Sequence, residues 1–145
     1  MFEILVPYIG YLISLVICGV ALLQKDPPLR WSAGVFIIGW MLTPAVSHVT
    51  RSGWDTPVAI IDTNAALILI WVSLRWRRLW SLVFAALMIL VLVVRVTAYF
   101  DSSIIRYAYQ ASNNVIVVFQ MLTLVVATVM AIRAQRRANE GAVRS

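Results

Sequence analysis

Five side chains that could do chemistry lie in otherwise apolar stretches of the sequence: His48, Asp62, Asn64, Arg95 and Gln120. A carboxylate and a guanidinium can form an ion pair, amides can donate and accept hydrogen bonds, and a neutral imidazole can ligate a metal. The carboxylates are too few and too widely separated for general acid–base catalysis, and no nucleophile, zinc-protease, Cys-x-x-Cys or phosphate-loop motif occurs. We therefore expect a protein that is not an enzyme.

His48 is the single histidine of the chain, so one chain cannot supply bis-histidine ligation of a haem. A lone imidazole could hold the magnesium of a chlorophyll-type pigment, but a histidine that hydrogen-bonds Ser47 or Asp62 is the commoner arrangement. Cys18 is the single cysteine, which excludes a disulfide framework and a thiolate metal site. The sequence predicts no metal and no cofactor, with a pigment or a lipid as the alternatives.

The composition indicates which solvent surrounds these residues. Hydrophobic residues make up 62% of the 145-residue chain and charged residues only 12%, against roughly 45–50% and about 25% in soluble domains. A small soluble core could not hide so much apolar surface, whereas a lipid bilayer accommodates it. The net charge of +6 does not indicate nucleic-acid binding, because the basic residues stand at the ends of apolar segments rather than on one face.

Five apolar stretches are each long enough to cross a bilayer as a helix. With a rise of about 1.5 Å per residue, a span of roughly 20 residues matches a hydrocarbon core of about 30 Å. Helices are expected because backbone groups in lipid must be paired internally. The predicted fold is an all-α, polytopic bundle in a single domain, followed by a cytoplasmic tail at 133–145, with spans at 4–23, 31–48, 57–74, 79–100 and 113–132.

The distribution of basic residues predicts the orientation. Nine basic residues fall on one side of the five spans and two, Arg51 and Arg106, on the other. The positive-inside rule makes the richer side cytoplasmic, so the N-terminus lies outside and the C-terminus in the cytoplasm of a bacterial-type inner membrane. The residues that carry most of this bias are Arg75, Arg77, Arg78, Arg133, Arg136 and Arg137.

This topology predicts where the chemical residues meet. Asp62 follows the start of the third span by about five residues, and Arg95 precedes the end of the fourth by about five. Consecutive spans run in opposite directions, so the two groups lie at similar depth and should pair, because an isolated ion in the bilayer costs about 2.5–3.5 kcal/mol. We expect hydrogen bonds to the pair from Thr63, Asn64 or Gln120, with His48 in the same outer half.

Small residues at four-residue spacing indicate close helix packing. They form one stripe in the first span and another in the last: Gly10, Ser14 and Cys18, then Thr123, Ala127 and Ala131. Both stripes are expected to pack within the chain, although one of them could face another subunit. The fourth span is expected to face lipid with its branched residues Leu82, Val83, Leu87, Leu90, Val91 and Val94.

The segments Asp62-Thr63-Asn64-Ala65-Ala66-Leu67 and Ser73-Leu74-Arg75-Trp76-Arg77-Arg78-Leu79-Trp80 resemble a pattern in small uncharacterised multi-span bacterial inner-membrane proteins. In these proteins an acidic residue opens one span and an Arg/Trp hairpin leads to the next. The resemblance covers spans three to five. It implies the topology and no activity.

Three hypotheses for function follow. The first is an accessory or scaffold subunit of a larger inner-membrane assembly, in contact with other membrane subunits or with further copies of itself. The second is a pore-forming lysis protein of the phage holin type. The small size and the basic C-terminal tail favour this hypothesis. The third is a module that binds a lipid or a pigment through the polar cluster.

Overall fold

The computed structural model describes residues 2–46, 56–100 and 106–143. All regular structure in these ranges is helical, which confirms the all-α class. The five helices are α1 (Phe2–Leu23), α2 (Pro27–Val46), α3 (Thr56–Trp76), α4 (Leu79–Phe100) and α5 (Arg106–Val143).

Helix α2 begins earlier than the sequence predicted. Pro27 and Pro28 were assigned to the link before the second span, but they open the helix. The first helical bond runs from the Arg30 amide to the Asp26 carbonyl at 3.1 Å, so Asp26 occupies the N-cap position. Aspartate favours that position, and proline suits the first turn because it lacks the amide hydrogen that would be unpaired there.

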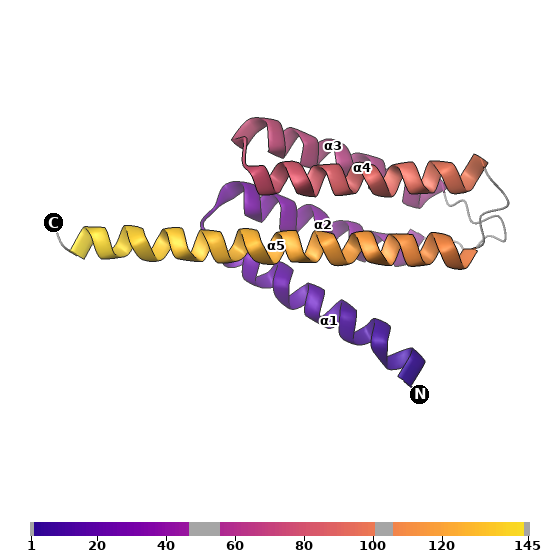
Figure 1. Ribbon diagram of the computed structural model, residues 1–145, viewed down its shortest axis with the longest axis horizontal. Coiled ribbons are helices and arrows are strands. Elements are labelled where there is room, and N and C mark those ends of the chain that lie inside the picture. Colours follow the sequence, from indigo (N-terminus) through magenta and orange to yellow (C-terminus); the bar gives the residue numbers. More distant parts are fainter. Residues whose placement is uncertain (1, 47–55, 101–105, 144–145) are drawn as a thin grey trace.

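Helix α5 is longer than predicted at both ends. Residues 106–112 were expected to belong to a separate link and 133–143 to a tail, but they continue the helix without a break. Hydropathy failed to show this because polar residues with good helix propensity, such as arginine and glutamine, extend a helix as readily as apolar ones. The C-terminal end of α5 consequently projects beyond the other helices (Figure 1).

The helices alternate in direction and pack in chain order around a common core. Helix α3 packs against α2 and α4, α4 also packs against α5, and α1 closes the bundle by contacting both α2 and α5. Toward its N-terminus α1 diverges from the other helices, and the two chain ends lie at opposite ends of the bundle (Figure 1). The α1–α2 and α3–α4 links therefore lie at the same end of the bundle (Figure 1).

The core is small relative to the apolar surface that remains outside it. Phe84, Leu29, Leu69 and Leu124 are fully buried where the helices meet. Many large apolar side chains point outward, among them Leu74 at 72% exposure and Leu79 at 86%. In the described part of the chain, Thr56–Trp76, Leu79–Phe100 and Ala111–Glu140 are long and apolar enough to cross a membrane, and Leu12–Leu23 is a shorter apolar helix.

Candidate functional site

The Asp62–Arg95 pair joins helices α3 and α4. Arg95 Nη2 donates a hydrogen bond to Asp62 Oδ2, and the two groups form a salt bridge. Asp62 lies six residues after the start of α3 and Arg95 five residues before the end of α4, so antiparallel packing brings them to one depth. Their side chains are only 15% and 11% exposed, respectively, so each charge depends on the other for much of its stabilisation.

The Arg95 guanidinium has more donors than this contact uses. Its Nε is buried and has no hydrogen-bond partner. Tyr109, half-buried near the start of α5, interacts electrostatically with both Arg95 and Asp62. Burial raises the pKa of the Tyr109 hydroxyl above its ordinary value, Arg95 opposes that rise, and Asp62 adds to it.

The three expected hydrogen-bond partners of the pair have other partners. Thr63 Oγ1 donates to the Ala59 carbonyl at 2.7 Å, and Asn64 Nδ2 donates to the Ile60 carbonyl at 2.8 Å, both within α3. The expectation for these two residues was wrong, because each amide or hydroxyl on a helix can reach the carbonyl one turn back. Both side chains are exposed on the outside of the bundle.

Gln120 lies in the core instead of beside the ion pair. It is 1% exposed, and its Nε2 contacts Met88 Sδ on α4 at 3.5 Å. Met88 precedes Arg95 by seven residues, which places it roughly 10 Å away along the helix. The expected polar cluster is thus divided into an ion pair, an outward-facing amide on α3 and a buried amide between α4 and α5.

His48, the remaining member of the predicted cluster, lies outside the described residues. Among the residues that are described, no group of three or more His, Cys, Asp or Glu side chains could hold a metal ion. The expectation that no metal binds stays a prediction.

The two small-residue stripes lie largely inside the bundle. Ser14 and Cys18 are buried in α1, whereas Gly10 is exposed and has open space beside its Cα. In α5, Ala127 is buried, and Thr123 and Ala131 are half-buried. Cys18 and Ala127 belong to the same buried core, and Ala131 packs against it. The larger part of both stripes therefore serves packing within the chain.

The expectation that α4 faces lipid was only partly right. Leu82, Val83 and Leu90 are exposed, but Val91 is 6% exposed and belongs to the buried side. Helix α4 packs against neighbours on two sides, α3 and α5, and buries Trp80, Ser81, Phe84, Ala85 and Met88 between them. Branched side chains fill a protein core as readily as they meet lipid, so residue type alone did not distinguish the two faces.

The arginines that predict orientation are all exposed: Arg75, Arg77, Arg78, Arg133, Arg136 and Arg137. Arg77 and Arg78 form the turn between α3 and α4. Arg75 lies in the last turn of α3 and stacks over the Trp76 ring with 5.9 Å to its centroid. Trp71 packs edge-on against Trp76 at 5.5 Å and against Trp31 of α2 at 6.0 Å. Tryptophan beside arginine is typical of a membrane–water boundary.

No family model matches this chain, and no curated protein and no solved structure is similar to it at a significant level.

Proposed function

We propose that this chain is a multi-pass inner-membrane protein that acts, without catalysis of its own, as an accessory or scaffold subunit of a larger membrane assembly. Three helices with the length and apolar character of membrane spans support the membrane location. The outward-facing leucines and valines support it further, because water would make such a surface aggregate.

The charge distribution supports all five helices as spans, with the N-terminus outside and the C-terminus in the cytoplasm. The alternating helix directions gather the α1–α2 and α3–α4 links at one end of the bundle (Figure 1). Exposed basic residues concentrate in these two links and in the helix turns beside them, at Lys25, Arg30, Arg75, Arg77 and Arg78. A positively charged end of a bundle faces the cytoplasm in most inner-membrane proteins.

The outward face of α3 supports the proposal that this chain binds a partner. Ile60, Leu67, Trp71 and Leu74 are 57%, 60%, 51% and 72% exposed, and Asn64 is exposed with them. Together these five residues repeat at intervals of four and three along the helix. We call them the α3 row. That spacing is the one with which a helix packs along a neighbouring helix in a left-handed pair.

Asn64 is the decisive member of the α3 row. It lies eight residues from the start of α3 and twelve from its end, roughly 12 Å and 18 Å along the axis, and so well inside a core of about 30 Å. Its single bond to the Ile60 carbonyl leaves its amide oxygen and one N–H on the outer surface. Lipid tails cannot pair with these groups, whereas a polar group on a second helix can.

Native mass spectrometry in mild detergent tests the proposal. The wild-type chain should leave its source membrane with companion chains, or with further copies of itself, at fixed stoichiometry. Asn64→Leu should weaken that assembly by about 1 kcal/mol, or roughly fivefold, because interhelical hydrogen bonds in membranes contribute on this scale.

The matched control is Thr97→Val, which also removes an exposed polar group, here on α4, whose hydroxyl bonds to its own helix at Val93. It should leave the assembly intact. A wild-type chain that runs as a monomer without companions, or an Asn64→Leu chain that assembles like wild type, would contradict the proposal.

A further inference from the structure

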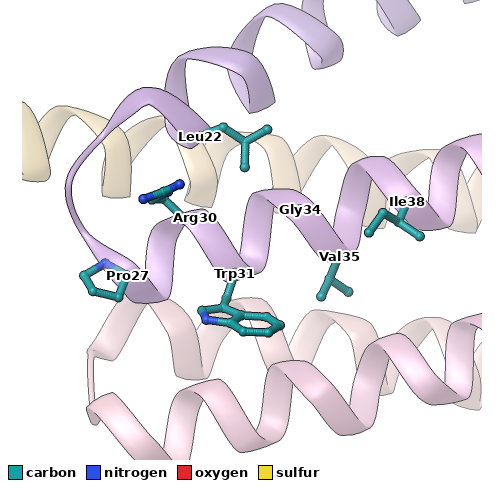
Figure 2. A pocket seen from close by; sticks show the side chains of 7 residues that line it. All are labelled: Leu22, Pro27, Arg30, Trp31, Gly34, Val35 and Ile38. Atoms are coloured by element: carbon teal, nitrogen blue, oxygen red, sulfur yellow. The ribbon is translucent and has the colours of Figure 1, made fainter.

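A trough of about 360 Å³ lies between the end of α1 and the first half of α2 (Figure 2). Its lining comes almost wholly from α2, with one residue of α1: Leu22, Pro27, Arg30, Trp31, Gly34, Val35 and Ile38. No residue of helix α3 or α4 lines it, although Trp31 on its edge packs against Trp71 of the α3 row at 6.0 Å.

Residue 34, midway along the trough, is a glycine and adds no side chain to it. Figure 2 shows Leu22 and Arg30 on one side of α2 and Trp31 and Val35 on the other, with Gly34 between them. A Cβ added at Gly34 would meet only Leu22 Cδ2, at 4.0 Å, which is ordinary van der Waals contact. A larger side chain could therefore occupy the space without displacing the backbone.

The trough changes in character along its length. Arg30, in the first turn of α2, is exposed at the end where the α1–α2 link carries the exposed Lys25. Asp26, between them in the sequence, offsets one of these two positive charges and leaves a net charge of +1. From Arg30 the trough continues over Gly34 and Val35 to Ile38, eight residues or roughly 12 Å further along the helix.

We propose that this trough binds one anionic phospholipid. The phosphate contacts the Arg30 guanidinium and the Lys25 ammonium, and an acyl chain lies over Gly34 against Val35 and Ile38. A net charge of +1 matches a headgroup with one negative charge, and guanidinium binds phosphate oxygens in pairs. The exposed Trp31 indole, 52% exposed, stands where tryptophans meet the headgroup layer.

A free phosphate ion or a second copy of the chain fits these features less well. The apolar stretch from Gly34 to Ile38 offers nothing to an inorganic anion, and the charge at one end offers nothing to an apolar helix. An amphiphile with a charged head and a long apolar tail uses both ends. The inference rests on the proposed membrane location and does not require a partner at the α3 row.

Native mass spectrometry of the full chain with added dioleoylphosphatidylglycerol or dioleoylphosphatidylcholine tests this site. Wild type should retain one phosphatidylglycerol, with at least a fivefold preference over phosphatidylcholine. Gly34→Leu should lower the retention of both lipids at least fivefold because it fills the trough. Arg30→Gln should abolish the preference and leave the weak retention of phosphatidylcholine, because the trough remains while its charge is lost.

Two matched controls accompany these variants. Gly39→Leu adds the same side chain on the same helix, at a glycine with nothing within 4 Å of its added Cβ, and Arg133→Gln removes an exposed arginine of α5 that does not line the trough. Both should bind lipid like wild type. Arg30 is exposed, so Arg30→Gln keeps the proposal testable even where Gly34→Leu fails to fold.

The outcomes separate the two proposals. A chain that does not insert into phosphatidylglycerol vesicles overturns the membrane function itself. A chain that inserts but shows no preference for phosphatidylglycerol, or binds it equally after Gly34→Leu and Gly39→Leu, overturns only the lipid site. Binding of inorganic phosphate at millimolar concentration, in the absence of lipid, would assign the site to an ion. A dimer of the chain that Gly34→Leu disrupts would assign the trough to a second copy. Either of the last two results would also overturn the lipid site.

Discussion

The α3–α4 hairpin holds arginines at both of its ends, and the two ends treat them in opposite ways. At the open end Arg95 is 11% exposed and forms a salt bridge with Asp62. At the turn Arg75, Arg77 and Arg78 are exposed, and Arg75 stacks on Trp76. Arginine thus lies within a helix-to-helix contact at one end of the hairpin and at the bundle surface at the other.

The difference shows how depth determines what a charge requires. Inside an apolar span a guanidinium has no water to solvate it, so it needs a fixed anion, and the pair stabilises the contact between two helices. At the end of a span, water, lipid headgroups and an indole face solvate the same group. Under the topology that we propose, the turn arginines respond to the membrane's charge asymmetry and set orientation.

Removing one member of the buried pair should have the largest effect. Asp62→Leu leaves Arg95 alone and should destabilise the bundle by about 3–5 kcal/mol. Arg95→Leu should cost less, because a lone carboxyl can take up a proton whereas a guanidinium keeps its charge. Denaturation in mixed micelles with increasing dodecyl sulfate measures both effects.

The double variant Asp62→Leu/Arg95→Leu sharpens this prediction. It should recover most of the lost stability, since two well-packed apolar residues often replace a buried ion pair without loss. Additive losses in the double-mutant cycle would mean that the two residues act independently, which would contradict the comparison between the two ends of the hairpin.

Neutralising the turn should have a smaller effect on stability and a visible one on orientation. Each basic residue near an anionic leaflet contributes about 1 kcal/mol, so replacing Arg75, Arg77 and Arg78 by glutamine removes roughly 3 kcal/mol of orientational preference. A cysteine introduced in the turn should then become accessible from both sides of the membrane. Lysines at Arg75, Arg77 and Arg78, which keep the three charges, serve as the control, and a turn that stays on one side in the glutamine variant as well would refute the role of these charges.

The smallest expected effect concerns the backbone of the same turn. Arg77 has φ of 48°, in the left-handed region, and its amide bonds to the Ser73 carbonyl at 2.9 Å as α3 ends. Glycine adopts this conformation freely, whereas an L side chain costs about 1–2 kcal/mol there. Arg77→Gly should therefore be about 1 kcal/mol more stable than Arg77→Ala in the same micelle assay. The two variants lose the same charge, so equal stabilities would show that the conformation carries no strain.

The sequence was sufficient to predict the helices and one contact between them. The apolar stretches gave four of the five helix positions closely, since α1, α3 and α4 differ from the predicted spans by two residues or fewer at each described end and α2 by four. Asp62 and Arg95 could be paired because depth on consecutive antiparallel helices is simple arithmetic. Helix α5 was underestimated, because hydropathy measures solubility in lipid and not helix formation.

The sequence was insufficient to predict the rotation of each helix about its axis. A helix that is apolar on all sides carries almost no signal for which side faces inward. Asn64 and Gln120 were both assigned to the ion pair, yet one points out of the bundle and the other into its core. The trough at Gly34 was not foreseen, because it depends on Leu22 of α1 approaching a position without a side chain. The one sequence signal for the trough was an arginine, Arg30, followed by a glycine one helical turn later, Gly34.

What the sequence determined by itself was the class of solvent, the helical secondary structure and the end of the bundle at which positive charge gathers, because these follow from composition and order along the chain. What the tertiary structure decided was which polar groups are satisfied inside the bundle, which face outward, and where a hollow remains. Those outcomes depend on how five apolar helices rotate and pack against one another, and packing is a property of complementary surfaces that no single helix encodes.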